Sequence, residues 1–491
     1  MKKYILKTLG IAAIFMIAVS CEDATDVVQE GELNEEVAFQ TVADLQTGLN
    51  GAYAAYGPDF GGNGTGDALY ANAILSDNLK AGQASNGQGA QAYAYIVNFA
   101  GGTPSSAIWA NRYATINRVN RVLRAMGNLT FTTQSDINEA NHIKGQLLGL
   151  RALAHFDLFE YYTVDYQDPN SLAIINVDFV PATSDAFERN TVAETVAFIN
   201  ADLAEANTLL DPSNITAATP IFINRDFVKA LQVKLAVNVG DFGAQTMTLT
   251  NQLLNDYPLA NQIQYSSMYL GADNTEVIFK LARVNGDNGV GGLFYFNQVM
   301  PNDAFLEISN QLLNELSALP NDIRRSVNLA PVSTIIGLDD PANELLINKY
   351  PGGSGGLQVN DIMIVRSSEI QLIKAEIEAR NGMLGNAAQT VQDLRDARTG
   401  SASPAPSYAS LNAALTDILS ERRKEFCFEG KRFLDIKRIG SEIGLGVNRL
   451  AVDCGTFDAP CDLAVGDFRF TLAIPQNELD GNNAITQNPG Y

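Results

Sequence analysis

Apolar residues recur at intervals of three and four along much of this chain, and the resulting stripes follow one another in pairs. This spacing places side chains on one face of an α-helix. In chain order, the stripes are Trp109, Tyr113, Ile116, Asn120 and Leu123; Leu150, Ala154, Leu158 and Tyr161; Phe227, Leu231, Leu235 and Asn238; Ile370, Ile373 and Ile377; and Ala387, Val391, Leu394 and Arg398. Because one amphipathic helix cannot bury its apolar face alone, these helices must pack against one another.

Glycine turns end some of these stripes, at Gly240 and at Asn381-Gly382, and small residues such as Ala375 and Ala388 suit close helix approaches. Helix, glycine turn and helix is the pattern of tetratricopeptide-like pairs, although a strict repeat of about 34 residues is absent. We predict a predominantly all-α domain of tetratricopeptide-like helix pairs, with long loop excursions and minor β-hairpins.

Five segments between the predicted helices are rich in Gly, Ser, Asn and Pro, which favour turns and loops. They span residues 61–66, 80–91, 285–292, 351–356 and 401–408. None contains the Gly-Lys-Ser/Thr that ends a phosphate-binding loop. Long loops in a compact domain are usually functional or mobile, so we expect the ligand surface among them.

The N-terminus has the pattern of a bacterial lipoprotein signal. Lysines at positions 2, 3 and 7 precede an apolar run at residues 9–19, and small residues precede Cys21. The apolar run is too short to span a bilayer. We expect a signal peptide at residues 1–20, lipidation of Cys21 and a tether at residues 21–40. An ordinary secretory signal with an incidental cysteine is the alternative.

The charge balance excludes one large class of partner. Acidic residues outnumber basic ones, 55 to 33, for a formal net charge of -22. Nucleic-acid binding requires clustered Lys and Arg, so this composition argues against it. After Cys21 the sequence contains no further apolar run of the roughly 18 residues that a transmembrane helix needs, which predicts a soluble domain tethered by its N-terminus.

Two of the remaining cysteines are placed for a local disulfide. Cys454 and Cys461 flank a turn-rich loop, and a secreted protein folds in an oxidising compartment. A calcium site that uses the aspartates of residues 453–467 is an alternative, but their order does not match a calcium-binding loop. Cys427 stands alone in an apolar helical stretch.

The sequence contains few candidate catalytic residues. The two histidines, His142 and His155, both fall in predicted helices. The chain has no Gly-x-Ser-x-Gly nucleophile turn, and a pair of carboxylates is uninformative among 55 acidic residues. We predict that the protein is not an enzyme, and we predict neither a cofactor nor a metal.

One charged residue is expected to lie inside the domain. Arg422 shares a helical face with Leu415, Leu419 and Phe426, and an unpaired charge on an apolar face would be costly. It should therefore have an acidic partner, for which Glu369 and Glu376 on the preceding helix are candidates. We predict that these residues form a structural clamp.

The region around Arg422 also carries a family resemblance. Residues 421–438 read ERRKEFCFEGKRFLDIKR and closely resemble the signature of the SusD/RagB family. Residues 474–480 (IPQNELD) and 487–491 (QNPGY) look like the terminal motif of that family. Residues 109–120 and 360–369 also resemble it, although Ser367-Ser368 replaces the usual aromatic-Ala pair. The resemblance implies one domain over residues 41–491, with an N-terminal part at 41–240 and a C-terminal part at 320–491.

Members of this family are outer-membrane nutrient-binding lipoproteins. The resemblance therefore implies a lipid-anchored protein on the cell surface that binds a glycan or oligosaccharide. It also implies a partner, a SusC-like TonB-dependent transporter that receives the ligand. Two alternatives stay open: a peptide-binding lipoprotein of the same family, and a repeat adaptor that binds a partner protein and no ligand.

Aromatic side chains are the candidates for ligand contact, because sugar-binding sites favour aromatic platforms. Those set in or beside the glycine-rich loops include Tyr70, Tyr93, Tyr95, Tyr295 and Phe296. The sole tryptophan, Trp109, is a further candidate, but its spacing from Tyr113 places it on the core-facing stripe. Packing of turns and core by these rings is the competing interpretation.

Overall fold

The computed structural model describes residues 38–57, 65–82, 84–87, 89–97, 104–182, 184–211, 220–287, 289–290, 304–353, 356–457 and 459–491. The predicted signal peptide, the lipidation site Cys21 and most of the predicted tether lie outside these residues, as do Tyr295 and Phe296. Helices dominate the described residues and strands are few and short, which confirms the predicted fold class.

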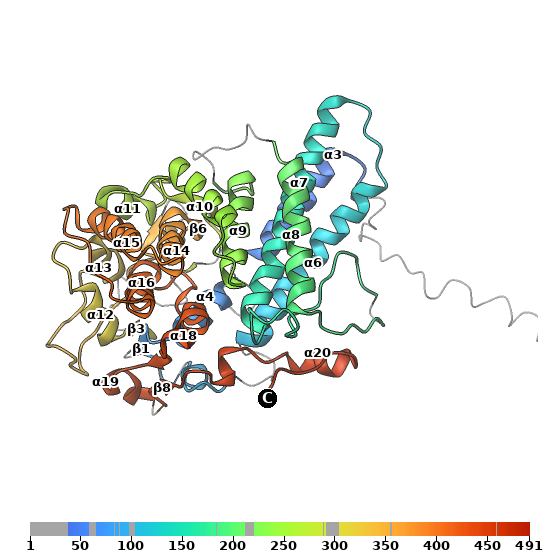
Figure 1. Cartoon of the computed structure of the whole chain (residues 1–491). Coiled ribbons are helices and arrows are strands. Elements are labelled where there is room, and N and C mark those ends of the chain that lie inside the picture. Colours follow the sequence, from blue (N-terminus) through green and yellow to red (C-terminus); the bar gives the residue numbers. More distant parts are fainter. Residues whose placement is uncertain are drawn as a thin grey trace, which may run out of the picture.

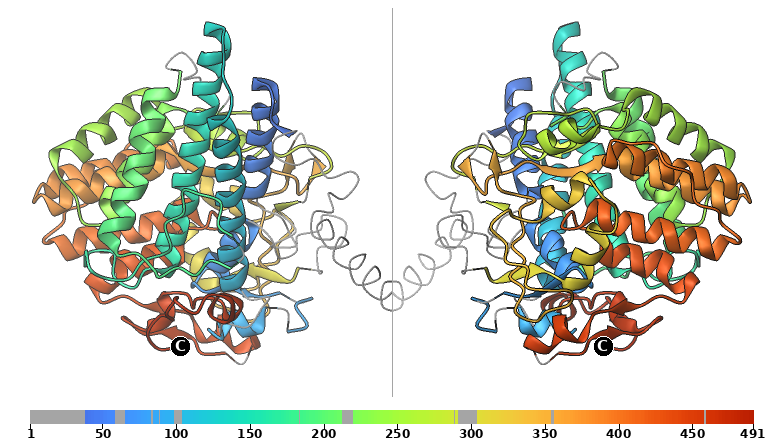
Figure 2. Two further views of the ribbon diagram at one scale, coloured as in Figure 1. Left: turned by 90° about the vertical axis from the view of Figure 1, so that its right-hand side faces the viewer. Right: turned by 90° about the vertical axis from the view of Figure 1, so that its left-hand side faces the viewer.

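The long helices form a curved row in which neighbours pack side by side (Figures 1 and 2). The row comprises α3 (Val42–Tyr56), α6 (Pro104–Gly127), α7 (Gln134–Tyr162), α8 (Val192–Leu209), α9 (Arg225–Asn238), α10 (Ala244–Asp256), α14 (Ser367–Arg380), α15 (Leu384–Thr399) and α16 (Leu411–Phe426). Most buried apolar side chains in these helices belong to one continuous core.

The starts of several helices follow from their sequence. Thr41 and Thr191 each form a capping box with an acidic residue three positions later, which satisfies free backbone N–H groups at the starts of α3 and α8. The side chain of Asn224 accepts hydrogen bonds from two backbone N–H groups at the start of α9.

Helices α14 and α15 are the pair that the sequence predicts most closely. The turn between them contains Gly382, whose φ of 77° lies in the left-handed region that favours glycine. Small side chains, Ala375 and Ala379 on α14 and Ala387 on α15, lie in one buried cluster with Val391. The close approach of the two helices therefore follows from the residues that the stripes contain.

The strands form four antiparallel pairs among the described residues. The pairs are β1 (Leu79–Ala81) with β3 (Leu306–Ile308), β2 (Val277–Leu281) with β6 (Ile362–Arg366), β4 (Gly352–Gly353) with β5 (Gly356–Leu357), and β7 (Val447–Asn448) with β8 (Asp462–Leu463). The last two pairs are local, as hairpins are. The first two join segments that lie far apart in the sequence, residues 79–81 with 306–308 and residues 277–281 with 362–366.

Shorter elements fill the space between the row and the strands. They are α4 (Thr65–Ile74), α5 (Ala90–Tyr93), α11 (Gln262–Met268), α12 (Asn310–Leu316), α13 (Ile323–Asn328), α17 (Arg432–Asp435), the π-helical turn η4 (Ile436–Gly440), α18 (Ser441–Ile443), α19 (Ala451–Cys454), the 3₁₀ turns η5 (Gly455–Phe457) and η6 (Phe468–Phe470), and α20 (Gln476–Gly481).

The end of the chain runs beneath the long N-terminal helices, as both views in Figure 2 show in red. The backbone N–H of Leu472 donates to the carbonyl of Tyr161 near the end of α7. The side chain of Asn488 donates to the carbonyls of Tyr162 and Leu472, and it accepts from Arg189. These contacts attach the end of the chain to the C-terminal end of α7. Among the described residues, no helix has both the length and the hydrophobicity of a membrane span.

Candidate functional site

A cavity of about 570 Å³ lies where three segments of the chain meet, and we call it the C-terminal cavity. The segments are the turn after α7 at residues 164–167, residues 436–445 in η4 and α18, and residues 465–471 near the C-terminus. The first segment is far from the other two in the sequence, and the end of the chain brings them together by packing beneath α7.

An exposed aromatic ring stands in the wall of this cavity. Phe468 retains 43% of its surface exposed, and the ring of Tyr491 packs against it edge-on with centroids 4.9 Å apart. Gly490, which directly precedes Tyr491, has a φ of 95°. A Cβ atom at this position would lie 2.4 Å from Cγ of Phe468. Only glycine fits at this position, so the terminal Pro-Gly-Tyr of the chain holds the Phe468 ring in place.

A partly buried lysine, Lys437, lines the cavity. Nζ of Lys437 donates to the carbonyls of Glu160 and Thr163, 2.9 and 2.7 Å away, and lies 4.6 Å from the ring centroid of Tyr166. The two carbonyls are at the C-terminal end of α7, where intrahelical donors are lacking. Burial lowers the pKa of Lys437 to about 7. Its role here is to cap α7.

The structure buries three of the aromatic residues predicted to contact ligand, so they offer no stacking face to solvent. Tyr93 is fully buried, and its hydroxyl lies 3.0 Å from the carbonyls of Leu79 and Asp453. Tyr95 is also buried. Trp109 packs between the rings of Tyr113 and Tyr162, with centroids 4.8 and 4.9 Å away. For these three residues the packing interpretation is the right one.

The remaining predicted aromatic residues differ in position. Tyr70 in α4 is partly buried and packs against the main core. Tyr295 and Phe296 lie outside the described residues. Their part in ligand binding stays a prediction.

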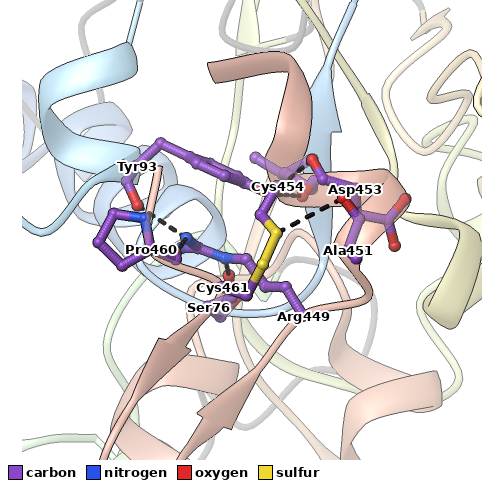
Figure 3. The surroundings of a disulfide bond; sticks show 9 residues. Ser76, Tyr93, Arg449, Ala451, Asp453, Cys454, Pro460 and Cys461 are labelled. Carbon is purple, nitrogen blue, oxygen red and sulfur yellow. Dashed lines mark hydrogen bonds between the residues drawn. A yellow bond between two sulfur atoms is a disulfide. The ribbon is translucent and has the colours of Figure 1, made fainter. Parts of the chain in front are cut away.

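The structure links Cys454 and Cys461 by a disulfide, with Cα atoms 5.3 Å apart (Figure 3). Arg449 lies beside it, and its guanidinium donates to the carbonyls of Ser76, Tyr93 and Pro460. The disulfide loop is thereby fixed to the end of α4 and to α5.

The aspartate next to this disulfide has a structural partner. Asp453 accepts hydrogen bonds at 2.9 Å from the backbone N–H and the side-chain amide of Asn310, the first residue of α12. Its carboxylate thus faces the N-terminus of a helix. Among the described residues, which leave out Asp458, no group of three or more His, Cys, Asp or Glu side chains is arranged to hold a metal ion.

One of the two predicted partners of Arg422, Glu369, contacts it, and Asp435, which was not predicted, lies closer. Nη2 of Arg422 lies 2.8 Å from Asp435 and 3.7 Å from Glu369. Asp435 belongs to the same sequence motif, and the short α17 turns it back toward α16. Glu376 does not contact Arg422, because it binds Arg438 at 2.7 Å and Arg380 at 3.0 Å.

A larger buried network surrounds this clamp, and the sequence analysis did not identify it. Glu421, Glu425 and Glu429 follow one another at intervals of four, at the end of α16 and just beyond it. Each binds a buried arginine from another element: Arg324 at 2.6 Å, Arg398 at 2.7 Å and Arg366 at 2.9 Å, respectively. The four-residue spacing places Glu421 and Glu425 on one face of α16 and was the available signal for these two, while Glu429 lies beyond the end of that helix.

The buried histidine also has a structural role. Nδ1 of His155 lies 2.9 Å from the carbonyl of Arg151, and Nε2 accepts a hydrogen bond from the backbone N–H of Val177. Burial lowers the pKa of His155 to about 3, so the ring is neutral at ordinary pH. Both ring nitrogens are engaged with backbone.

Two family models match the chain, one toward each end. Residues 26–221 match the model described as starch-binding associating with outer membrane, and residues 345–491 match the SusD family. SusD-like protein P2 from Formosa agariphila is 26% identical over 541 aligned positions, which cover the whole of both chains.

Solved structures share the fold. A SusD superfamily protein from Bacteroides thetaiotaomicron has a TM-score of 0.75 at 23% identity, over 91% of this chain and 100% of that chain. A putative sugar binding protein from Bacteroides vulgatus has a TM-score of 0.75 at 22% identity, over 92% of this chain and 99% of that chain. These structures, each under 25% identical, show that the fold is shared. The two family models show that the chain belongs to the SusD/RagB family.

Proposed function

We propose that this protein is a cell-surface lipoprotein of the outer membrane that binds glycans or oligosaccharides and delivers them to a SusC-like TonB-dependent transporter. The observation that carries the proposal is the family match at both ends of the chain, because one matching model is named for starch binding and outer-membrane association. The sugar-binding protein of the same fold supports it.

The ligand surface of this proposal lies in and beside the glycine-rich loops. Tyr70, Tyr295 and Phe296 are the proposed contacts, now that Tyr93, Tyr95 and Trp109 are known to be buried. Aromatic rings stack on the apolar faces of sugars, and neighbouring Asn, Gln and Asp side chains fix orientation by hydrogen bonds. Moderate affinity, with Kd from micromolar to millimolar or about -8 to -4 kcal/mol, would allow release to a transporter.

The proposal is tested with a glycan array probed with the full chain purified in detergent. The array should carry neutral oligosaccharides (glucans, mannans, galactans and xylans) and acidic ones (uronates and sulfated glycans), with short peptides as a parallel set. Binding to oligosaccharides supports the proposal. Binding to peptides alone would replace it with the peptide-binding alternative, and binding to neither would favour the adaptor.

A further inference from the structure

We propose that the C-terminal cavity is a second carbohydrate site, distinct from the loops, and that it takes a neutral oligosaccharide across the ring of Phe468. This inference rests on the proposed function, and it adds a site and a ligand class to it. The cavity volume of about 570 Å³ falls within the roughly 300–1,000 Å³ typical of small-molecule sites.

Phe468 is suited to be a stacking platform because it is both exposed and held rigid. Tyr491 packs on one side of the ring, and the backbone at Gly490 leaves it no room to move in that direction. A ring fixed before binding loses little conformational entropy when a ligand stacks on it. Val164 and Val465, which are 45% and 43% exposed, extend the apolar wall on either side of the cavity.

Carboxylates supply the polar part of the site. Asp165 accepts a hydrogen bond from the backbone N–H of Gln167 at 2.9 Å, and Asp467 accepts three hydrogen bonds from Arg469 at 2.9, 2.8 and 2.7 Å. Glu442 pairs with Arg380 at 2.8 Å and keeps 39% of its side chain exposed. These partners fix the carboxylates, whose remaining lone pairs can accept hydrogen bonds from sugar hydroxyls.

The cations in the wall are already engaged. Lys437 donates to two carbonyls at the end of α7, and Arg438 makes a bidentate pair with Glu376 at 2.7 and 2.8 Å. The cavity therefore presents acceptors and an aromatic ring to a ligand, with no cation directed to it among the lining residues. That arrangement favours a neutral polyhydroxylated ligand and disfavours uronates and sulfated glycans.

Two other cavities of similar size in the described part of the chain lack this combination. One of about 610 Å³ lies beside His142 and Arg225, and one of about 470 Å³ lies beside Gln262 and Gly400. No Phe, Tyr or Trp is among the described residues that line either of them. The aromatic platform distinguishes the C-terminal cavity from these two.

The test uses the neutral oligosaccharide that binds most strongly on the array, titrated into the full chain by calorimetry. The Phe468→Ala substitution should raise the Kd of this oligosaccharide at the C-terminal cavity by roughly tenfold or more, because the stacking surface is lost. Ser441→Trp should weaken binding as strongly, because it fills the cavity from an exposed position without removing a contact. The matched control is Phe179→Ala, since Phe179 is 44% exposed and also packs on one aromatic ring, that of Phe187, but does not line the cavity.

Hydrogen exchange then locates the ligand and makes the outcomes distinct. Saturating oligosaccharide should slow exchange at residues 164–167 and 465–471 in the wild type, and it should not do so in Phe468→Ala. If the wild type binds a neutral glycan while both cavity variants and the exchange at these residues are unchanged, the cavity proposal is wrong and the proposed function stands. Binding only to acidic glycans would overturn the ligand class, and binding to no glycan would overturn both proposals. Thermal unfolding of each variant shows whether it is folded.

Discussion

Glu425 shows how the family signature acts at the scale of single residues. It is fully buried and contacts the guanidinium groups of Arg324, Arg366 and Arg398. Burial alone would raise the pKa of its carboxyl, but Arg398, Arg366 and Arg324 hold that pKa well below its usual range. The charge is retained because three elements of the fold converge on it.

Replacing this charge should therefore be costly. We expect Glu425→Gln to lower the free energy of unfolding by about 3–5 kcal/mol, as when one partner of a buried ion network is removed. Glu205→Gln is the comparison, because Glu205 forms a surface pair with Lys144 in which both side chains are more than a third exposed, and it should cost at most about 1 kcal/mol. Urea unfolding of the two variants measures the difference. Equal effects would mean that the network contributes no more than a surface pair.

His155 gives stability a pH dependence with a definite sign. The folded pKa of about 3 lies below the ordinary value of 6.5 because the ring is buried. Between these values the unfolded chain binds more protons, so this site adds stability that is complete above pH 6.5 and is lost as pH falls toward 3. In the wild type, this histidine should make the free energy of unfolding rise by up to about 1.4 kcal/mol per pH unit between about pH 5 and 6.5. We expect the His155→Gln variant to lack this part of the rise. His142→Gln, at a partly buried position, should change the slope less. Parallel profiles for the wild type and His155→Gln would contradict this account.

Elements differ in how far the sequence predicts them. The α14 and α15 pair could be predicted because its signals are local: apolar period, small residues and Gly382 in the turn. The β1 and β3 pairing could not, since its partners lie more than 200 residues apart. The same limit explains Tyr93, whose hydroxyl is satisfied by a carbonyl 360 positions later in the chain. A tyrosine beside a glycine-rich loop looks exposed until that distant partner is known.

The C-terminal cavity could not be predicted from the sequence, for the same reason. Its wall combines the turn after α7 with residues near the C-terminus, and neither segment carries a recognisable binding motif alone. The local signal that could have pointed to it is the terminal Pro-Gly-Tyr. A glycine directly before an aromatic end residue indicates a close approach, and here that approach is to Phe468.

The disulfide between Cys454 and Cys461 should stabilise the folded protein. Because the bond closes a short loop, its loss in the double variant Cys454→Ser/Cys461→Ser should lower unfolding free energy by about 2–3 kcal/mol. Thiol labelling of the unfolded, non-reduced protein followed by mass mapping tests the bond itself. It should modify the buried Cys427 and leave Cys454 and Cys461 unmodified. Labelling at either of the latter two in the protein isolated from cells would show that the bond does not form there.

At the scale of the whole molecule, the account requires an anchor at the N-terminus. If Cys21 is the lipidated residue, Cys21→Ala should release the protein from the membrane, because the acyl chains would be absent. Fractionation of cells at high salt measures this, and the wild type processed in parallel is the control. A variant that remains with the outer membrane would rule out the lipoprotein assignment.

The described chain is held together by the helical row, the two long-range strand pairs and the buried ion networks. It supports two proposed ligand sites, one in the loops and one in the C-terminal cavity. The proposed delivery of a ligand involves a transporter as partner. The composition of the native complex is the most direct test. The wild-type protein, isolated by antibody from outer membranes solubilised in mild detergent, should carry a SusC-like TonB-dependent transporter at comparable stoichiometry. Recovery of the protein alone, with glycan binding intact, would contradict delivery to a transporter and leave a free-standing glycan binder.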